Sequence, residues 1–383
     1  MKKSYTLIDP SKKKDWSIQM HDRLITCTSG KRIAEKEFEK EMLASKDFFK
    51  KVQAKFNQGF IYEDADAEFG EAKLIFRFGN KYSGFYGQDY NEASGILAIS
   101  WPKTQKGEYY KVQLNPFEVL LQKDWLSFDL FKLQWANKNQ LVGIYSGKIT
   151  LIDGDDPNNV ELLTIGDYKA ETNFELQYPV LVANSGTDLV AQTIDDKKEF
   201  FSIPLHMGSD QKPLFSLHAN KEVLAIAKPE GMVVLMNITA NELMLSIDTG
   251  FEFITKVHVL SKRDEIVVQG GPDSPGTKFY DMKDGKEIFK KFDLSFKYHS
   301  GAIFKANGIG TYAVSNNGKY FAAGCGYIDN SQILIFDYES CELVKTIEVD
   351  FVNKGFQLFF SKSDSLLFVR TDEGFVIVIN FTE

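Results

Sequence analysis

The feature that most constrains this 383-residue chain is a repeat in its C-terminal four-fifths. Each unit reads as strand, turn, strand, loop, apolar strand, acidic turn and final strand. The turn residue after the third strand recurs at Asp153, Asn237, Asp281, Asp337 and Asn380. The steps are 84, 44, 56 and 43 residues, so the first spans two units and the third holds one unit plus a loop. Four strands with a period of about 40–45 residues predict the blades of a β-propeller, in which small sheets cover each other's faces.

One unit shows the pattern in detail. The stretch 332–349, QILIFDYESCELVKTIEV, is interpreted as the third and fourth strands of one blade. Its first half is apolar at consecutive positions, as expected for a strand that neighbours cover on both faces. Its last residues, KTIEV, alternate between polar and apolar. We therefore expect them to form an outer strand with one wetter side.

The count of units predicts a mainly β protein in which a seven-bladed propeller occupies residues 72–383. The last unit ends at its third strand, because only Thr382 and Glu383 follow. Residues 72–78, AKLIFRF, precede the first unit and have no other partner in the pattern. We expect this strand to complete the final blade, which closes the ring and removes an exposed edge.

The units resemble WD-repeat propeller blades over roughly residues 72–383. The Trp-Asp pair of that family appears here as Phe336-Asp337 and Tyr280-Asp281, and the family's Gly-His dipeptide is absent. Taken by themselves, the aspartates are interpreted as ordinary turn residues.

Residues 1–66 do not follow the repeat and predict a separate small α+β module. SYTLID, DWSIQM and RLITCTSG predict short strands, and a helix is expected from about Ala34. Gly59 stands where a helix C-terminal cap belongs. The expected apolar stripe of this helix is Phe38, Met42, Phe49, Val52 and Phe56. The expected opposite face carries Lys36, Lys40, Lys50, Lys51 and Lys55.

This module is similar to a WGR domain over about 60 residues. The similarity rests on Trp16-x-Ile18, on ITCTSGKR (25–32), on Lys36-Glu-Phe38 and on Lys55-Phe-Asn-Gln-Gly59-Phe60. Ser29-Gly30-Lys31-Arg32 stands near the place of the defining Trp-Gly-Arg. The resemblance implies a DNA-end contact of the kind made in poly(ADP-ribose) polymerases. The candidate residues for binding nucleic acid or another partner are Lys12, Lys13, Lys14, Arg23, Lys31 and Arg32.

Charge divides the chain in the same way. Residues 1–62 contain 14 Lys and Arg against 8 Asp and Glu, a net charge of +6, whereas the remainder carries −14. A basic module of this kind predicts weak, salt-sensitive binding to nucleic acid, with a dissociation constant of about 10⁻⁴ to 10⁻⁶ M. The alternative is a solvated basic face that keeps the module soluble.

Composition favours a cytoplasmic protein. Three cysteines, Cys27, Cys325 and Cys341, are too few and too scattered for a disulfide framework. The N-terminal MKKSYTLIDPSKKK lacks the apolar segment of a secretory signal, and no apolar run is long enough to span a bilayer.

No local sequence motif indicates catalysis or a cofactor-binding site. The histidines are His21, His206, His218, His258 and His299, and no pair has metal-ligand spacing. The DGDD loop at 153–156 resembles a calcium loop, but Thr164 stands where the bidentate glutamate would be. The glycine-rich 270–276 lacks the helix and lysine of a phosphate loop.

Three functions follow in order of preference. The first is a non-catalytic interaction scaffold that binds a protein partner and needs no cofactor. The second is nucleic-acid binding through the basic module. The third is an enzyme with its site in the propeller channel, where residues from different blades converge without leaving a local signature.

Overall fold

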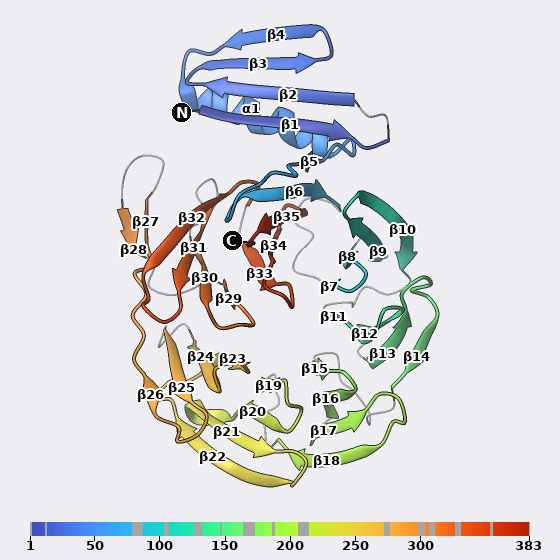
Figure 1. The fold of residues 1–383 in the computed structure, drawn as a ribbon, viewed down its shortest axis with the longest axis vertical. Helices are drawn as coiled ribbons and strands as arrows, with labels where there is room; N and C mark the ends of the chain where they lie inside the picture. Colours follow the sequence, from blue (N-terminus) through green and yellow to red (C-terminus); the bar gives the residue numbers. More distant parts are fainter. Residues whose placement is uncertain are drawn as a thin grey trace.

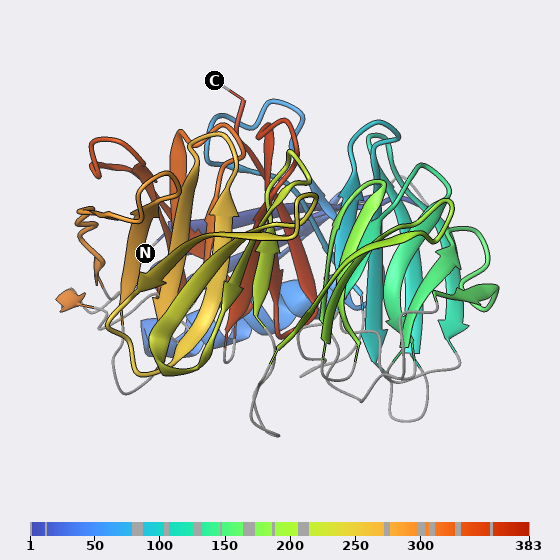
Figure 2. The ribbon, with the colours of Figure 1, turned by 90° about the horizontal axis from the view of Figure 1, so that it is seen from below.

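A computed structural model describes residues 2–11, 14–78, 87–102, 107–125, 132–145, 148–163, 173–185, 188–205, 214–271, 276–297, 303–305, 311–325, 331–352 and 355–382. Figure 1 shows a small N-terminal sheet with one helix beside a larger circle of radially arranged sheets. Seen from the edge in Figure 2, the strands of the circle run along its axis. Within the described residues, no helix combines the length and apolar character that crossing a membrane requires.

Each sheet of the circle is an antiparallel meander whose first strand lies nearest the centre (Figure 1). The first sheet consists of β7 (Gln88–Asn91), β8 (Ile96–Pro102), β9 (Gly107–Leu114) and β10 (Phe117–Trp125). The second sheet consists of β11 (Leu133–Trp135), β12 (Gln140–Tyr145), β13 (Lys148–Asp153) and β14 (Val160–Leu162). The third sheet consists of β15 (Phe174–Gln177), β16 (Val180–Ser185), β17 (Asp188–Thr193) and β18 (Glu199–Pro204). The fourth sheet consists of β19 (Phe215–Leu217), β20 (Val223–Ala227), β21 (Met232–Asn237) and β22 (Glu242–Asp248). A short 3-10 turn, Pro229–Gly231, precedes β21.

The remaining sheets complete the circle. The fifth sheet consists of β23 (Ile254–Leu260), β24 (Glu265–Gly270), β25 (Thr277–Asp281) and β26 (Glu287–Ile288). The sixth sheet consists of β29 (Thr311–Val314), β30 (Tyr320–Cys325), β31 (Ser331–Asp337) and β32 (Leu343–Val349). The last sheet has the order β33 (Phe356–Phe360), β34 (Leu366–Thr371), β35 (Phe375–Asn380), β6 (Ala72–Arg77), β5 (Tyr62–Glu63). The loop inferred from the 56-residue step contains a hairpin of β27 (Ser295–Lys297) and β28 (Ile303–Lys305).

The 332–349 stretch forms the hairpin that its pattern predicts. β31 pairs with β32, with Ile333 opposite Ile347. Residues 331–336 of β31 are all buried, whereas β32 exposes alternate residues until it ends at buried Val349. The third strand is buried on both faces because it lies inside its sheet and against neighbouring sheets, and the fourth strand is the outer edge.

The strand at 72–77 joins the far end of the chain. β6 pairs antiparallel with β35, with Ile75 opposite Ile377 and Leu74 opposite Val378. The backbone of Gly70 donates to the carbonyl of Asn380 at 2.7 Å, so the pairing continues beyond the strand ends. One sheet therefore combines residues from the first fifth of the chain with its last residues.

Several of the hairpins between first and second strands are hydrogen-bonded to the hairpin of a neighbouring sheet. These contacts join Asn91 to Asn137, His218 to Asp264, Arg263 to Gly318, Asn316 to Asp364, and Ser363 to Glu92. The last contact, 2.8 Å from the Ser363 backbone to the Glu92 carboxylate, links the final sheet to the β7–β10 sheet. The hairpin end of the circle is thus continuous across the point where the chain closes on itself.

The recurring turn residues share one structural role, which confirms that they are turn residues. Each ends or directly follows a third strand, and its side-chain oxygen accepts a hydrogen bond from the backbone two residues later. The donors for Asp153, Asn237, Asp281, Asp337 and Asn380 are Asp155, Thr239, Lys283, Glu339 and Thr382. This short-range capture of backbone N–H groups is the reason Asp and Asn favour such turns.

The helix of the N-terminal module begins later than predicted. The module contains β1 (Lys2–Asp9), β2 (Lys14–His21), β3 (Leu24–Ser29), β4 (Arg32–Glu37) and α1 (Glu41–Phe56). The expectation that the helix begins near Ala34 is wrong, because residues 32–37 pair with β3 as a fourth strand. Gly30, with φ 58°, makes the tight turn between β3 and β4.

The buried stripe of the helix is also shifted. α1 buries Ala44, Phe48, Val52 and Phe56 against the sheet, at steps of four residues. Met42 is 73% exposed and Phe38 precedes the helix, so the expected stripe is wrong at both positions. The predicted lysine face changes as well, because Lys36 belongs to β4, and Lys55 lies over the rings of Trp16 and Phe60.

The helix C-terminus follows the prediction. Gly59 has φ 85°, its N–H donates to the Phe56 carbonyl at 2.9 Å, and the N–H of Phe60 reaches back to the Lys55 carbonyl at 3.2 Å. This left-handed glycine ends the helix and turns the chain toward the circle of sheets.

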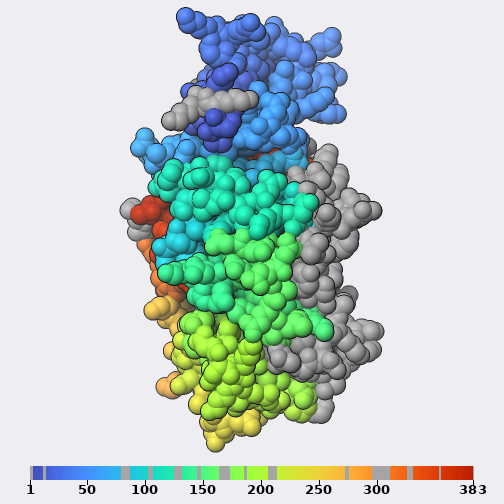
Figure 3. All heavy atoms as spheres, turned by 90° about the vertical axis from the view of Figure 1, so that its right-hand side faces the viewer, coloured from blue at the N-terminus to red at the C-terminus, as the bar shows by residue number. Residues whose placement is uncertain are grey.

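Module and circle share one hydrophobic core. A single cluster of buried residues includes Ile18 and Phe48 of the module together with Val369 and Ile377 of the last sheet. The space-filling view shows the module seated directly on the rim of the circle (Figure 3). The connecting segment is tied down too, since Ala67 is buried and its carbonyl accepts from the Asn380 side chain at 2.8 Å.

Candidate functional site

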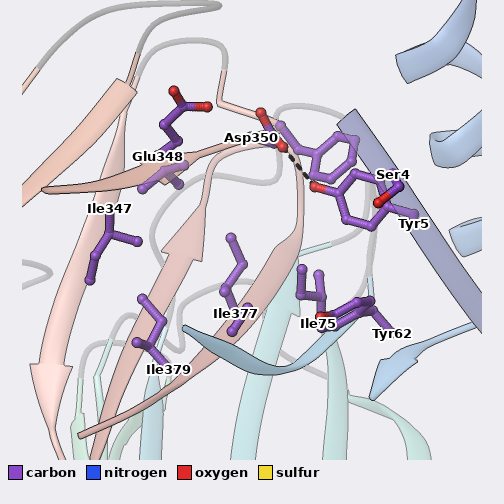
Figure 4. Close-up of a pocket in the computed structure, with 12 residues that line it drawn as sticks. Ser4, Tyr5, Tyr62, Ile75, Ile347, Glu348, Asp350, Ile377 and Ile379 are labelled. Atoms are coloured by element: carbon purple, nitrogen blue, oxygen red, sulfur yellow. Dashed lines mark hydrogen bonds between the residues drawn. The ribbon is translucent and has the colours of Figure 1, made fainter. Parts of the chain in front are cut away.

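A cavity of about 210 Å³ lies where the module meets the last sheets (Figure 4). It is lined by Ser4, Tyr5, Tyr62, Ala72, Ile75, Ile347, Glu348, Val349, Asp350, Phe351, Ile377 and Ile379. β1 contributes Ser4 and Tyr5, while β6, β32 and β35 contribute the isoleucines. The cavity therefore has a mixed apolar and polar lining and is acidic at one end.

The module supplies both a cation and a hydrogen-bond donor to the acidic end. The Tyr5 hydroxyl donates to Asp350 at 2.6 Å, and the Lys3 ammonium lies 2.9 Å from Asp350 and 3.4 Å from Glu348. Burial and the adjacent Asp350 carboxylate raise the pKa of Tyr5 well above its ordinary value. Burial would lower the pKa of Lys3, but the two carboxylates outweigh it and raise the pKa. This network acts as a polar clamp between module and circle.

A second group of polar residues lies on the innermost strands. Lys132 directly precedes β11, Glu175 is on β15, and Lys256 and His258 are on β23. Lys256 and His258 are half-buried, whereas Val257 and Val259 between and after them are buried. Alternate residues of a strand point to opposite sides, so Lys256 and His258 share the wetter side of β23.

These groups influence one another electrostatically. Burial lowers the pKa of Lys256 to about 8, against the raising effect of Glu175. Burial, together with the positive charges of Lys256 and Lys132, lowers the pKa of His258 to about 4. These residues lie on, or directly before, β11, β15 and β23, the first strands of their sheets, which lie nearest the centre of the circle (Figure 1).

The structure separates the basic residues that the sequence grouped together. Lys12 and Lys13 lie outside the described residues. Lys14 begins β2, and Lys31 and Arg32 lie at the β3–β4 turn; all three are exposed. The register pairs Trp16 with Ser29 and Ser29 with Arg32, which puts the three residues at one end of the sheet.

Arg23 lies at the other end of the same sheet. The register puts it one residue beyond Leu24, so it lies about 20 Å along the strand direction from Ser29 at about 3.4 Å per residue. Its guanidinium lies 3.3 Å from the Glu37 carboxylate and 3.5 Å from the Glu39 carbonyl. Arg23 therefore belongs to a local ion pair and not to the group formed by Lys14, Lys31 and Arg32.

The other sequence candidates have structural surroundings. His21 is exposed beside Asp22, and His218 bridges two hairpins by contacting Asp264 at 3.1 Å and the Ser261 carbonyl at 3.2 Å. His206, His299, Thr164 and residues 272–275 lie outside the described residues. In the parts of the chain that the structure describes, no three His, Cys, Asp or Glu residues are grouped as metal ligands.

Sequence reasoning missed both the clamp and the central residues. The clamp joins Lys3 and Tyr5 to Asp350, more than 340 residues away, and nothing local indicates such a contact. The central residues leave one trace, which is the segment TKVHV at 255–259. There a lysine and a histidine occupy alternate positions of an otherwise apolar strand.

Comparison with known proteins bears on the fold. No family model matches the sequence, and no curated protein matches it. The β-propeller domain of Cps50 (Swd1) from Myceliophteria thermophila is similar in structure. It has 14% identity and a TM-score of 0.58, over 82% of this chain and 100% of that domain. A chain of the mitotic checkpoint complex is similar with 11% identity and a TM-score of 0.62, over 84% of this chain and 95% of that one. These likenesses confirm the predicted β-propeller fold.

Proposed function

We propose that this protein is a cytoplasmic interaction scaffold, in which a seven-bladed WD-repeat-like propeller binds a protein partner without catalysing a reaction. The observation that carries the proposal is the fold likeness over more than four-fifths of the chain, since one of the similar chains is part of the mitotic checkpoint complex. The three cysteines, all unpaired in the structure, agree with a reducing compartment. The pairing of β6 with β35 serves as the closure of the propeller.

The outer wall of the propeller offers contacts that a partner could use. Adjacent apolar residues are exposed on β22, with Leu243 at 60% and Met244 at 51%. A bulge between Leu235 and Met236 in the pairing of β21 with β22 leaves Met244 without a cross-strand partner. Phe289, directly after β26 of the neighbouring sheet, is 83% exposed. Large apolar side chains exposed in this way are typical of interaction surfaces.

The test is quantitative affinity purification of the tagged full-length protein from its native cells. We expect a partner that co-purifies in a fixed ratio and is reduced at least tenfold by L243E/M244E. The matched control is V119E/L120E on β10, another exposed apolar pair beside a bulge. All variants must keep the wild-type melting temperature. If no protein co-purifies in a fixed ratio with the wild type, or if both double variants behave alike, the proposed wall is wrong.

Nucleic-acid binding by a WGR-like N-terminal module is the second candidate. It is supported by the register of β2, β3 and β4, which gathers exposed Lys14, Lys31 and Arg32 at one end of the sheet. Fluorescence anisotropy of the full chain with duplex DNA and with RNA, at 50 and 200 mM salt, tests it. K31E/R32E should weaken binding and reduce its salt dependence, whereas R23E at the far end should have a smaller effect. Absence of binding at 50 mM salt rejects this candidate.

A further inference from the structure

Charged side chains from three sheets lie on, or directly before, the innermost strands of the propeller. Lys132 and Glu175 come from the sheets β11–β14 and β15–β18, and their side chains meet at 2.9 Å. Lys256 and His258 come from the sheet β23–β26, on a different part of the circle (Figure 1). All four are half-buried although they belong to the innermost strands or directly precede one. Water therefore reaches these side chains from the centre of the ring.

The charges in this group are not balanced. Lys132 is well compensated, because it pairs with Glu175 and also bonds to the Phe174 carbonyl and the Asn173 side chain. Lys256 has weaker partners: its ammonium lies 3.4 Å from the Tyr312 carbonyl and 3.8 Å above the centre of the Tyr312 ring. No described carboxylate forms an ion pair with Lys256. A half-buried ammonium without a salt-bridge partner is partly desolvated at a cost in free energy, and an anion supplied from solution would reduce that cost.

The same region contains acceptors that lack donors. Among the described side chains, the amide oxygens of Gln88 on β7 and Gln134 on β11 are buried without a hydrogen-bond partner, as is the hydroxyl of Tyr312. Gln134 lies two residues after Lys132, on the same side of its strand. Buried polar groups are nearly always satisfied in native proteins, by water or a ligand where not by protein. A ligand that also carries hydroxyl groups would satisfy them.

We propose that the centre of the propeller binds a small hydroxylated anion, a carboxylate or a phosphate monoester, with Lys256 as the principal counter-ion. His258, on the same side of β23 as Lys256, is the expected hydrogen-bonding partner of the ligand, and the Lys132–Glu175 pair is the expected opposite wall of the site. Glu175 limits the site to small anions, because its carboxylate repels a ligand that extends negative charge across the ring. This inference goes beyond the scaffold role and does not depend on it.

Isothermal titration calorimetry with the full chain tests the site, using glycerate, glucose 6-phosphate and inorganic phosphate as separate probes at pH 7.0. Glycerate represents small hydroxylated carboxylates, glucose 6-phosphate represents phosphate monoesters, and inorganic phosphate is the anion without the organic part. We expect saturable binding of glycerate or of glucose 6-phosphate, at least tenfold tighter than inorganic phosphate. K256M should weaken it at least tenfold, whereas K262M, which removes an exposed lysine from the next hairpin, should leave it unchanged.

A second readout needs no ligand. Because Lys256 is charged and poorly compensated, K256M should melt at a higher temperature than the wild type in anion-free buffer. If K256M does not fold, K256Q replaces it with a neutral polar side chain of similar reach. The proposal is overturned if no probe binds the wild type saturably, if inorganic phosphate binds as tightly as the organic anions, or if the Lys256 variants bind like K262M.

Discussion

The ring of Phe375 on β35 is stacked on the ring of Phe351, with centroids 4.2 Å apart and an interplanar angle of 12°. Phe56, at the end of α1, meets the Phe375 ring edge-on at 5.2 Å. Phe351 follows β32, so three segments meet at one aromatic centre. The N-terminal module is therefore held to the propeller by core packing and not only by its connecting segment.

Truncating Phe375 should destabilise the whole protein. The side chain is fully buried, and F375A would leave a cavity beneath both Phe56 and Phe351. We expect a loss of about 3–5 kcal/mol in the free energy of unfolding, measured by urea titration. F289A is the control, because Phe289 is 83% exposed and its loss should change the free energy by less than about 0.5 kcal/mol. Equal effects of the two substitutions would contradict this account of the joint.

Proline at Ile75 should open the closing sheet. Ile75 lies inside its sheet, opposite Ile377 on one side and Tyr62 on the other. I75P removes a ladder hydrogen bond and should cost about 3 kcal/mol or more, whereas I75V should cost about 0.5–1.5 kcal/mol because it removes one methylene group. Size-exclusion chromatography and thermal melting distinguish the two. A stable monomeric I75P protein would show that β6 is not required to close the ring.

His258 should make the protein sensitive to acid. Its pKa falls from 6.5 to about 4 on folding, because of burial and the charges of Lys256 and Lys132. Between these values the unfolded chain takes up a proton that the folded chain does not, so stability decreases as the pH falls. H258Q removes the titrating imidazole and with it this pH-dependent contribution to stability. In paired urea titrations, H258Q should lose less stability than the wild type between pH 6.5 and pH 4.5. Parallel stability curves would exclude the mechanism. Glu175 is the acidic group facing this cluster and is present in both proteins.

The hydrogen bonds of the Asp337 turn should contribute modestly to the stability of the folded protein. Its carboxylate accepts hydrogen bonds from the backbone N–H groups of Ser340 at 2.8 Å and Glu339 at 3.0 Å, which lower its pKa below the ordinary value. D337A should reduce the free energy of unfolding by about 1 kcal/mol at pH 7. D337N keeps an oxygen acceptor and should retain most of the stability. The difference between wild type and D337A should shrink as the pH falls through the pKa of Asp337, since protonation weakens the acceptor.

Local regularity explains what could be predicted. The turn residues at Asp281 and Asp337 act through bonds to their own neighbours, so they mark the repeat in the sequence as well as in space. β4 was missed because Arg32–Glu37 is exposed throughout and carries no apolar alternation. The helix stripe was misplaced because Met42 and Phe49 compete with Phe48 for an apolar pattern, and only the sheet above decides which one is buried.

The sites depend on long-range geometry and were not predictable in the same way. Lys132, Glu175 and Lys256 are spread over more than 120 residues, and their strands lie around one centre because the sheets are arranged in a circle. The clamp between Tyr5 and Asp350 likewise exists only once the circle is closed. Neither contact affects the hydrophobic period of its own strand, which is the information that a single sequence offers.

The pairing of Ile75 with Ile377 also determines how long β6 must wait for its partner strand during synthesis. About 300 residues separate the two, so a ribosome adding roughly 5–20 residues per second needs about 15–60 s to produce the second after the first. Throughout that interval β6 has left the ribosome without β35, and its edge is open to other nascent chains. Chaperone occupancy of residues 72–77 during translation is therefore expected to persist until β35 has been synthesised and can pair with β6.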